Sequence, residues 1–273
     1  GIRSTVNTYF ANMFGGYLRK IECAYRPYEV TRGETEKAVQ ESIDLMHDTF
    51  LNKKSKSKAL KKIVKIFKDI KLHKEERPKV AIFGDLYVKW NDVMNQNLIK
   101  TIEENGGEVI VTPNNEHFKL VVEPYMQQWF LDGDYPEFAI TALLKKIIPA
   151  IEKKYFTYFN QIIPTKPYKL SQNYKDILNR LHLTIRHSGE SMENIIKIFA
   201  LMERYSDISL FVQTNPSYCC PSLITEAMAS KLEKITGIPI VTIEYDGTKS
   251  NKNEDIIPYL VYPRQKKVLQ KSS

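Results

Sequence analysis

The sequence has few of the features that build secreted or membrane-spanning proteins. Its 273 residues include only 3 cysteines, too few for the disulfide framework of a small secreted domain. No apolar run approaches the roughly 20 residues that a membrane-spanning helix needs, and no signal segment of basic and then apolar residues opens the chain. We therefore expect a cytoplasmic globular protein with no membrane partner. The 42% of hydrophobic residues is enough to bury a full core.

Common nucleotide-binding and metal-binding motifs are also absent. Gly84-Asp85 follows an apolar run, but the chain has neither the G-x-G-x-x-G pattern nor the lysine of a phosphate-binding loop. We therefore do not expect this chain to bind ATP itself. The five histidines show no H-x-H or H-E-x-x-H spacing and no pairing with the cysteines. We interpret them as surface or capping residues: His47, His73, His117, His182 and His187.

The net charge of +8 is concentrated in one segment. Residues 52–79 carry 12 Lys and Arg against 3 Asp and Glu, a local balance of +9 that leaves the rest of the chain at −1. Leu60, Ile63, Phe67 and Ile70 recur there at helical spacing, with lysines between them. We interpret the segment as a packed helix with a solvated lysine face, rather than as a helix that lies on a membrane or an anionic partner. We expect no nucleic-acid partner.

Hydrophobic spacing predicts helices in the first part of the chain and in its middle. Residues 1–77 show helical patterns near 5–25 and 35–50, separated by the break RPYEVTRGE and followed by the basic linker. Residues 117–205 are also mostly helical in pattern.

Two strand–helix–strand units flank this middle stretch. The first consists of the apolar run 79–85, a helical pattern at 93–107 and the run 108–113. The second consists of the runs 207–216 and 238–247 with a helical pattern at 221–237 between them. Strands that are buried on both faces have such continuous apolar runs, and these units wind right-handed into parallel sheets.

We therefore predict an α/β fold with a Rossmann-like four-stranded parallel sheet in the order 2-1-3-4. In this order the chain returns beside its first strand after the helical insertion. The predicted α/β domain spans 78–265 and contains the insertion 117–205. A helical N-terminal region occupies 1–77, and a tail occupies 266–273.

The predicted strand order has a topological switch point between the first and third strands, where open α/β sheets bind ligands. The residues that follow these two strands are the candidate cofactor-binding residues: Gly84, Asp85, Asn215, Ser217 and Tyr218. Asp246 ends the last strand at the same edge. It either helps to wall the site or forms a plain surface turn.

Cys219 and Cys220 lie at this edge and directly precede Pro221, a residue typical of the first helical position. The free N–H groups and the dipole of a helix N-terminus favour a thiolate, the form that binds metal. Neighbouring side chains cannot easily both ligate one iron, so we predict that one cysteine is the metal ligand. The alternative is a pair of ordinary buried thiols. Cys23, in a helical segment, is interpreted as structural.

Longer stretches around the cysteine pair show a family resemblance. They read NPSYCCPSLITEAM and, further along, KITGIPIVTIEYDGTKSNKNEDIIPYL. These stretches resemble the carboxyl-terminal part of the 2-hydroxyacyl-CoA dehydratase family, especially the dehydratase-like region of acyl-CoA dehydratase activase-related proteins. Upstream blocks of the same group are similar to KVAIFGDLYVKWNDVMNQNLIKTIEENGGEVIVTP and IECAYRPYEVTRGETEKAV.

The resemblance implies a role in anaerobic metabolism. In that family a cysteine-bound 4Fe-4S cluster receives one electron from an ATP-dependent activator and passes it to a 2-hydroxyacyl-CoA, which then expels its hydroxyl group. The implied partners are therefore an ATP-dependent activator domain or protein and an acyl-CoA substrate. A second copy of the chain, forming a dimer, is a further possible partner. Cys219 or Cys220 would be the cluster ligand carried over to this chain.

The ligand count departs from the family pattern. A cubane cluster needs three or four thiolates, whereas Cys219 and Cys220 come from a single turn. Either the remaining ligands lie in an amino-terminal portion that is absent from this chain, which begins at Gly1 without an initiator methionine, or the site is degenerate. In both cases we expect the chain to hold no complete cluster by itself. Three hypotheses follow: a component of an iron–sulfur dehydratase (a lyase) or of its activator, a non-catalytic α/β docking or binding module, and a thiol enzyme without metal.

Overall fold

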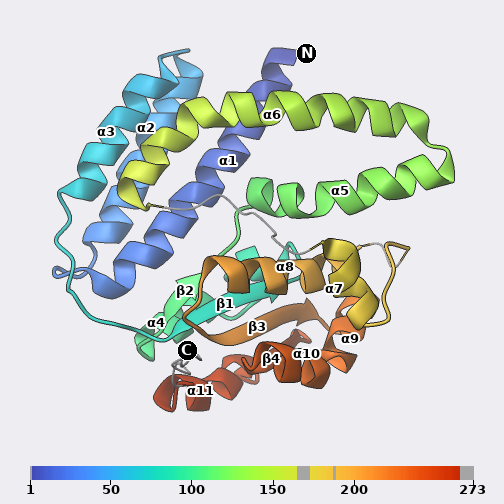
Figure 1. The fold of residues 1–273 in the computed structure, drawn as a ribbon. Helices are drawn as coiled ribbons and strands as arrows, with labels where there is room; N and C mark the ends of the chain where they lie inside the picture. Colours follow the sequence, from blue (N-terminus) through green and yellow to red (C-terminus); the bar gives the residue numbers. More distant parts are fainter. Residues whose placement is uncertain (1, 165–172, 187–188, 265–273) are drawn as a thin grey trace, which may run out of the picture. The chain divides into compact units, whose positions relative to one another are not determined.

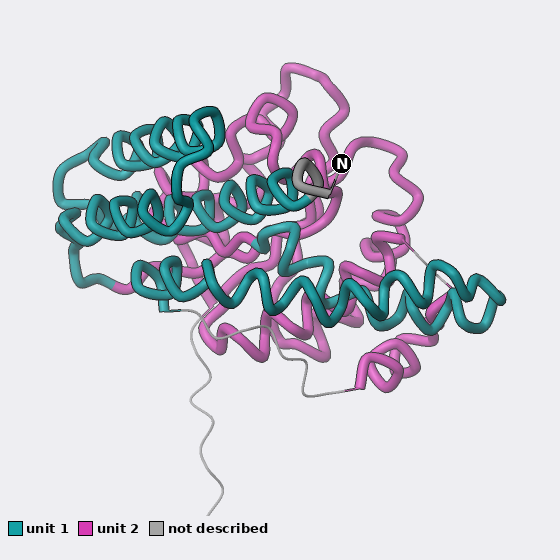
Figure 2. The backbone as a smooth tube through the Cα atoms, turned by 90° about the horizontal axis from the view of Figure 1, so that it is seen from above, with its two compact units in different colours: residues 1–75, 112–167 teal, residues 76–111, 168–273 magenta. Residues whose placement is uncertain are grey.

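The computed structural model describes residues 2–164, 173–186 and 189–264 (Figure 1). The chain divides into two compact units, drawn in different colours in Figure 2. The first, here called the helical unit, contains residues 1–75 and 112–167. The second, here called the sheet unit, contains residues 76–111 and 168–273. The predicted tail at 266–273 and His187 lie outside the described residues.

The helical unit contains long helices, one 3-10 turn and no strand among its described residues. Its elements are α1 (Ile2–Tyr25), η1 (Arg26–Tyr28), α2 (Glu34–Leu51), α3 (Lys56–Lys68), α5 (Asn114–Asp132) and α6 (Tyr135–Ile162). Aromatic side chains from different helices fill its core. The Tyr17 ring of α1 stacks on Phe159 of α6 with 4.8 Å between the ring centroids. The helices of the predicted insertion 117–205 thus divide between the two units, since α5 and α6 belong here.

The basic segment forms the packed helix that its spacing predicts. In α3 the side chains of Leu60, Ile63 and Phe67 are buried, while most of its lysines are solvent-exposed. The Ser55 side chain caps the helix by accepting a hydrogen bond from the Lys58 N–H, which satisfies one of the free amides of the first turn. The lysine excess is therefore the solvated face of a core helix.

The sheet unit contains four parallel strands in the order β2-β1-β3-β4, which confirms the predicted order 2-1-3-4. The strands are β1 (Lys79–Gly84), β2 (Glu108–Ile110), β3 (Ile208–Pro216) and β4 (Ile240–Tyr245). The helical elements are η2 (Val88–Trp90), α4 (Leu98–Glu104), α7 (Tyr174–Arg180), α8 (Glu190–Arg204), α9 (Cys220–Ala227), α10 (Ala229–Thr236), η3 (Lys252–Ile256) and α11 (Ile257–Val261). β1 and β3 are buried along almost their whole length, as continuous apolar runs predict.

Two of the predicted helices in the sheet unit have different bounds in the structure. The pattern at 93–107 gives only α4, because the Asn91 side chain accepts hydrogen bonds from the Val93 and Met94 N–H groups and holds a turn there. Asn97 then adopts a left-handed conformation, with φ of 59°, directly before the helix. The pattern at 221–237 divides at Met228 into α9 and α10.

The register of the strands brings their carboxyl ends to one edge. Gly84 at the end of β1 pairs with Thr214 of β3, and Asn215 of β3 pairs with Glu244 of β4. The residues after β1, β3 and β4 therefore share the switch-point edge. Among the residues that the structure describes, no helix is both long and apolar enough to span a bilayer.

Candidate functional site

Gly84 allows β1 and β3 to approach each other closely at the switch point. Its φ is +110°, and a Cβ added there would lie 2.4 Å from the Thr214 carbonyl oxygen and 2.8 Å from the Thr214 nitrogen. Any side chain would collide with backbone atoms, which cannot move aside as a flexible side chain could. The glycine is thus required by the pairing of the two strands.

Asp85 organises the turn that follows β1. Its backbone N–H donates to the Thr214 carbonyl at 2.9 Å, which continues the pairing with β3. One carboxylate oxygen accepts hydrogen bonds from the N–H groups of Tyr87 at 2.9 Å and Val88 at 2.7 Å. This arrangement caps the start of η2. The Asp85 carboxylate is therefore engaged by its own loop.

The cysteine pair lies on an exposed turn between β3 and α9. Tyr218 adopts a left-handed conformation, with φ of 64°, and its side chain is 91% exposed. Cys219 is the N-cap residue of α9 and its carbonyl accepts hydrogen bonds from the Ser222 and Leu223 N–H groups. Cys220, next to the N-cap, is the first residue of the helix, so Pro221 occupies the second helical position rather than the predicted first.

The three cysteines differ in accessibility. Cys220 is exposed and Cys219 is partly buried, whereas Cys23 in α1 of the helical unit is fully buried. The prediction that Cys23 is structural agrees with its burial. The interpretation of the pair as ordinary buried thiols does not fit Cys220, whose side chain can be reached from solvent.

Asn215 points into the protein. Its side chain is fully buried and its Oδ1 accepts a hydrogen bond from Gln213 Nε2 at 3.3 Å. Gln213 Nε2 also donates to the Ser222 carbonyl at 3.0 Å, which ties β3 to α9. The predicted site residues therefore separate. Asn215 lies inside β3, in a buried polar layer, whereas Tyr218 after the strand is at the surface, with Ser217 partly buried between them.

Asp246 forms a compact turn after β4. One carboxylate oxygen accepts hydrogen bonds from the Thr248 N–H at 2.9 Å and from the Thr248 hydroxyl at 2.6 Å. The other pairs with Lys252 Nζ at 2.9 Å. The Thr248 hydroxyl and Lys252 hold the pKa of this exposed carboxyl well below its usual range. These contacts favour the plain-turn interpretation, since they occupy the carboxylate.

The described residues do not fit a complete 4Fe-4S cluster. Among them, no group of three or more histidine, cysteine or acidic side chains could hold a metal ion. Cys219 and Cys220 supply two thiols from one turn, and a cubane cluster needs about twice that number from several directions. The site can offer one exposed thiol ligand, but it cannot enclose the cluster.

Two buried lysines near the switch point escaped the sequence analysis. Lys89, in η2, is 4% exposed, and Lys197, in the middle of α8, is fully buried. Burial, together with the neighbouring Lys197, lowers the pKa of Lys89 well below its ordinary value. Burial lowers the pKa of Lys197 to about 8, although the carboxylate of Glu193 opposes this shift. The signal in the sequence is a single lysine inside the apolar stretch NIIKIFALM.

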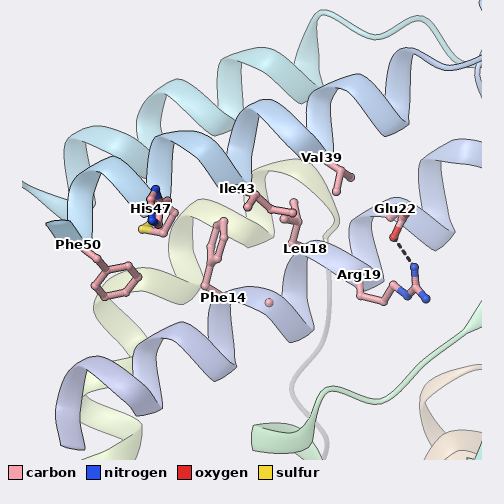
Figure 3. Close-up of a pocket in the computed structure, with 10 residues that line it drawn as sticks. Phe14, Leu18, Arg19, Glu22, Val39, Ile43, His47 and Phe50 are labelled. Atoms are coloured by element: carbon pink, nitrogen blue, oxygen red, sulfur yellow. Dashed lines mark hydrogen bonds and ion pairs between the residues drawn. The ribbon is translucent and has the colours of Figure 1, made fainter. Parts of the chain in front are cut away.

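A separate cavity of about 450 Å³ lies in the helical unit (Figure 3). Figure 3 shows Phe14 and Leu18 of α1 opposite Ile43 of α2, with the Arg19–Glu22 ion pair at one end. The cavity is lined by Phe14, Gly15, Leu18, Arg19, Glu22, Val39, Ile43, Met46, His47 and Phe50. None of the predicted site residues is among them.

Comparison with family models, with curated proteins and with solved structures finds no match to this chain.

Proposed function

We propose that this chain is a non-catalytic docking and binding component of a 2-hydroxyacyl-CoA dehydratase-type system. The observation that carries the proposal is the exposed turn of Cys219 and Cys220 at the carboxyl edge of the sheet, without further metal ligands around it among the described residues. A turn of this kind can meet a partner but cannot build a redox centre alone. The resemblance of the surrounding stretches supplies the class of system.

The surface beside the cysteines supports a docking role. Tyr218, Leu223 and Ile224 are exposed on the turn and the first part of α9, next to the exposed Cys220. Tyr87 is 67% exposed in the loop after β1, whose end pairs with β3. Exposed aromatic and apolar side chains at a single edge are typical of protein–protein interaction sites. The proposed partner is the ATP-dependent activator domain or protein.

A second candidate function is a catalytic iron–sulfur component whose remaining ligands come from outside the described residues. The accessible thiol of Cys220 at the start of α9 favours it, because a ligand shared with another chain must be reachable from solvent. In this case the chain would supply one ligand of a shared cluster and a wall of the acyl-CoA site. The docking role needs fewer assumptions about residues beyond this chain.

A binding experiment with an activator protein of the 2-hydroxyacyl-CoA dehydratase type tests the docking role. Sedimentation of the mixture with and without ATP should reveal a complex, and Tyr218→Ala should weaken it at least about tenfold, as expected for an aromatic anchor. Lys231→Met is the control, since Lys231 is exposed on α10, outside the turn and α9. Equal affinity of wild type and Tyr218→Ala, or no complex under anaerobic conditions with ATP, would contradict the docking role.

A further inference from the structure

The helices α5 and α6 of the helical unit form a hairpin, here called the arm. Gly133 ends α5 with a left-handed φ of 83°, and Pro136 lies in the first turn of α6. The two helices pack side by side (Figure 1). An ion pair between Lys145 of α6 and Glu123 of α5, with 3.0 Å between nitrogen and oxygen, joins them. The arm is therefore a defined structural element.

The contacts with α5 identify the inner face of α6. The centre of the Phe138 ring lies 5.7 Å from that of Phe130 at the end of α5. Glu152 accepts a hydrogen bond from Asn115 Nδ2 at 2.9 Å. Phe138, Lys145 and Glu152 recur at every seventh position and so lie on one side of α6. In the core of the helical unit, the described residues that come from α6 belong to its second half, beginning at Tyr155.

A second stripe on α6 is apolar and faces solvent. This outer stripe consists of Ile140, Leu143, Leu144 and Ile147, which recur at the three- and four-residue spacing of one helix face. Ile140 is 60% and Leu143 is 58% exposed, and the other two are also exposed. A repeat of about 3.6 residues per turn places the outer stripe opposite the face that contacts α5. The spacing is that of a helix packed on two sides, whereas this helix is covered on one.

The exposed apolar area of the arm is large. Three more apolar side chains are exposed at its tip: Phe130, Leu131 and Tyr135. Together with the outer stripe they expose roughly 800 Å², similar to the area that each partner contributes to an interface of standard size. The largest apolar patch on a typical monomer covers about 300–600 Å². The arm therefore has enough apolar surface for one side of a stable interface.

The charges on α6 indicate what covers the outer stripe. The N-terminal end of the helix carries acidic residues, Asp134 and Glu137, and basic residues follow further along: Lys145, Lys146, Lys153 and Lys154. A helix with the same order of charges matches this one when it runs antiparallel, because each acidic end then lies beside a basic segment. A second copy of α6 meets this requirement. An anionic lipid surface does not, since it would repel the acidic end.

We propose that the outer stripe of α6 forms the centre of a dimer interface with a second copy of this chain. The two α6 helices pack antiparallel about a two-fold axis, so that the same surface of both copies is buried. The arm belongs to the helical unit, whereas the turn of Cys219 and Cys220 belongs to the sheet unit. The dimer is therefore independent of the docking role proposed above.

A two-fold axis between Leu143 and Leu144 gives the interface a definite register. Ile140 then lies opposite the partner's Ile147, which buries the outer stripe against itself. Asp134 lies level with the partner's Lys153. The Asp134 side chain makes no capping hydrogen bond at the start of α6, and Lys153 is exposed. The symmetry makes this charge pair occur twice.

Sedimentation equilibrium of the whole chain between about 1 and 100 μM tests the dimer, which should have a dissociation constant in the micromolar range or below. Leu143→Lys should weaken the dimer at least about tenfold, because it places two like charges at the axis. Leu51→Lys is the matched control, since Leu51 is exposed at the end of α2, outside the arm, and gains the same charge. The control should dimerise like the wild type.

Charge reversal tests the antiparallel register. Asp134→Lys alone and Lys153→Asp alone should each weaken the dimer about threefold to tenfold, because each creates two like-charge contacts. The two substitutions together should restore the affinity of the wild type. Circular dichroism checks that each variant keeps its helix content, as expected for substitutions at exposed positions.

Three outcomes would overturn the proposal. The first is a wild-type chain that stays monomeric up to about 100 μM, where an interface of this size should associate. The second is a dimer that Leu143→Lys leaves as tight as that of the control. The third is a monomer that binds vesicles of phosphatidylcholine and phosphatidylglycerol through the arm, which would assign the outer stripe to a lipid surface. If Leu143→Lys fails to fold, the charge-reversal variants decide, and unchanged affinity in both single variants refutes the interface.

Discussion

Lys197→Met should stabilise the protein, which is an unusual result for a buried substitution. Lowering the pKa of Lys197 from its ordinary 10.5 to about 8 means that the folded state disfavours the ammonium by about 3 kcal/mol at neutral pH, at about 1.4 kcal/mol for each unit of pKa. Methionine has similar length and no charge, so it removes the cost of burying an ammonium group. Loss of the attraction of Glu193 opposes part of this gain. We expect a net stabilisation of about 1–3 kcal/mol.

The pH dependence of unfolding separates this cause from general packing effects. Between pH 8 and the ordinary lysine pKa, the unfolded chain holds a proton on Lys197 that the folded chain has released. The free energy of unfolding of the wild type should therefore rise with pH in that window. The full cost of burying the Lys197 ammonium is present only below pH 8. Lys197→Met should lose the part of this rise that Lys197 contributes, while the lowered pKa of the buried Lys89 leaves the rest. Burial raises the pKa of Tyr245, so its phenol does not ionise in the folded state within this pH window.

Urea unfolding between pH 7 and 9.5 measures both effects in wild type, Lys197→Met and the surface control Lys231→Met. The control should follow the wild type at every pH. Destabilisation of Lys197→Met by more than about 2 kcal/mol would show that the lysine makes favourable contacts when buried, contrary to the reasoning above. An unchanged pH slope in Lys197→Met would show that Lys197 does not titrate in this window.

The remaining predictions concern the backbone at the switch point and the thiols. Gly84→Ala should destabilise the protein by at least about 2 kcal/mol in urea unfolding, because the new Cβ meets Thr214. Gly106→Ala, at a similar positive φ with nothing within 4 Å, should cost only about 1 kcal/mol, and equal costs would refute the steric argument. Alkylation of the native protein should label Cys220 rapidly and leave Cys23 unlabelled until unfolding, as peptide mass mapping can determine. Labelling of Cys23 at a comparable rate would contradict its burial.

The sequence predicts the sheet well, because its information is local. Continuous apolar runs identify the strands, and their separation by helical patterns leads to the observed order. Gly84-Asp85 and Pro221 are turn and helix-start signals that depend on nearest neighbours. The turn lies where it is predicted, and α9 begins one residue before Pro221. The late start of α4 was missed because asparagine side chains around Asn91 hold a turn that an apolar pattern does not reveal.

The features that the sequence did not predict depend on contacts between residues far apart in the chain. The helices α5 and α6 pack with the N-terminal helices because, among other contacts, Glu116 accepts a hydrogen bond from the Tyr17 hydroxyl at 3.1 Å and pairs with Lys20. No periodicity in either segment specifies that partner. The lysine pair is similar, since Lys89 and Lys197 are 108 positions apart and only the fold brings their amines together. The pattern of a single sequence therefore does not predict which helices and strands pack against one another.

The iron content of the chain after anaerobic reconstitution tests the central claim most directly. The chain should be reconstituted with iron and sulfide, desalted and assayed for iron, sulfide and visible charge-transfer absorption, beside a variant with both Cys219→Ser and Cys220→Ser. A docking component with one accessible thiol turn should retain far less than one cluster per chain. The double variant should retain as much iron and sulfide as the wild type. A full 4Fe-4S complement in the wild type that disappears in the double variant would contradict this account and support the catalytic alternative.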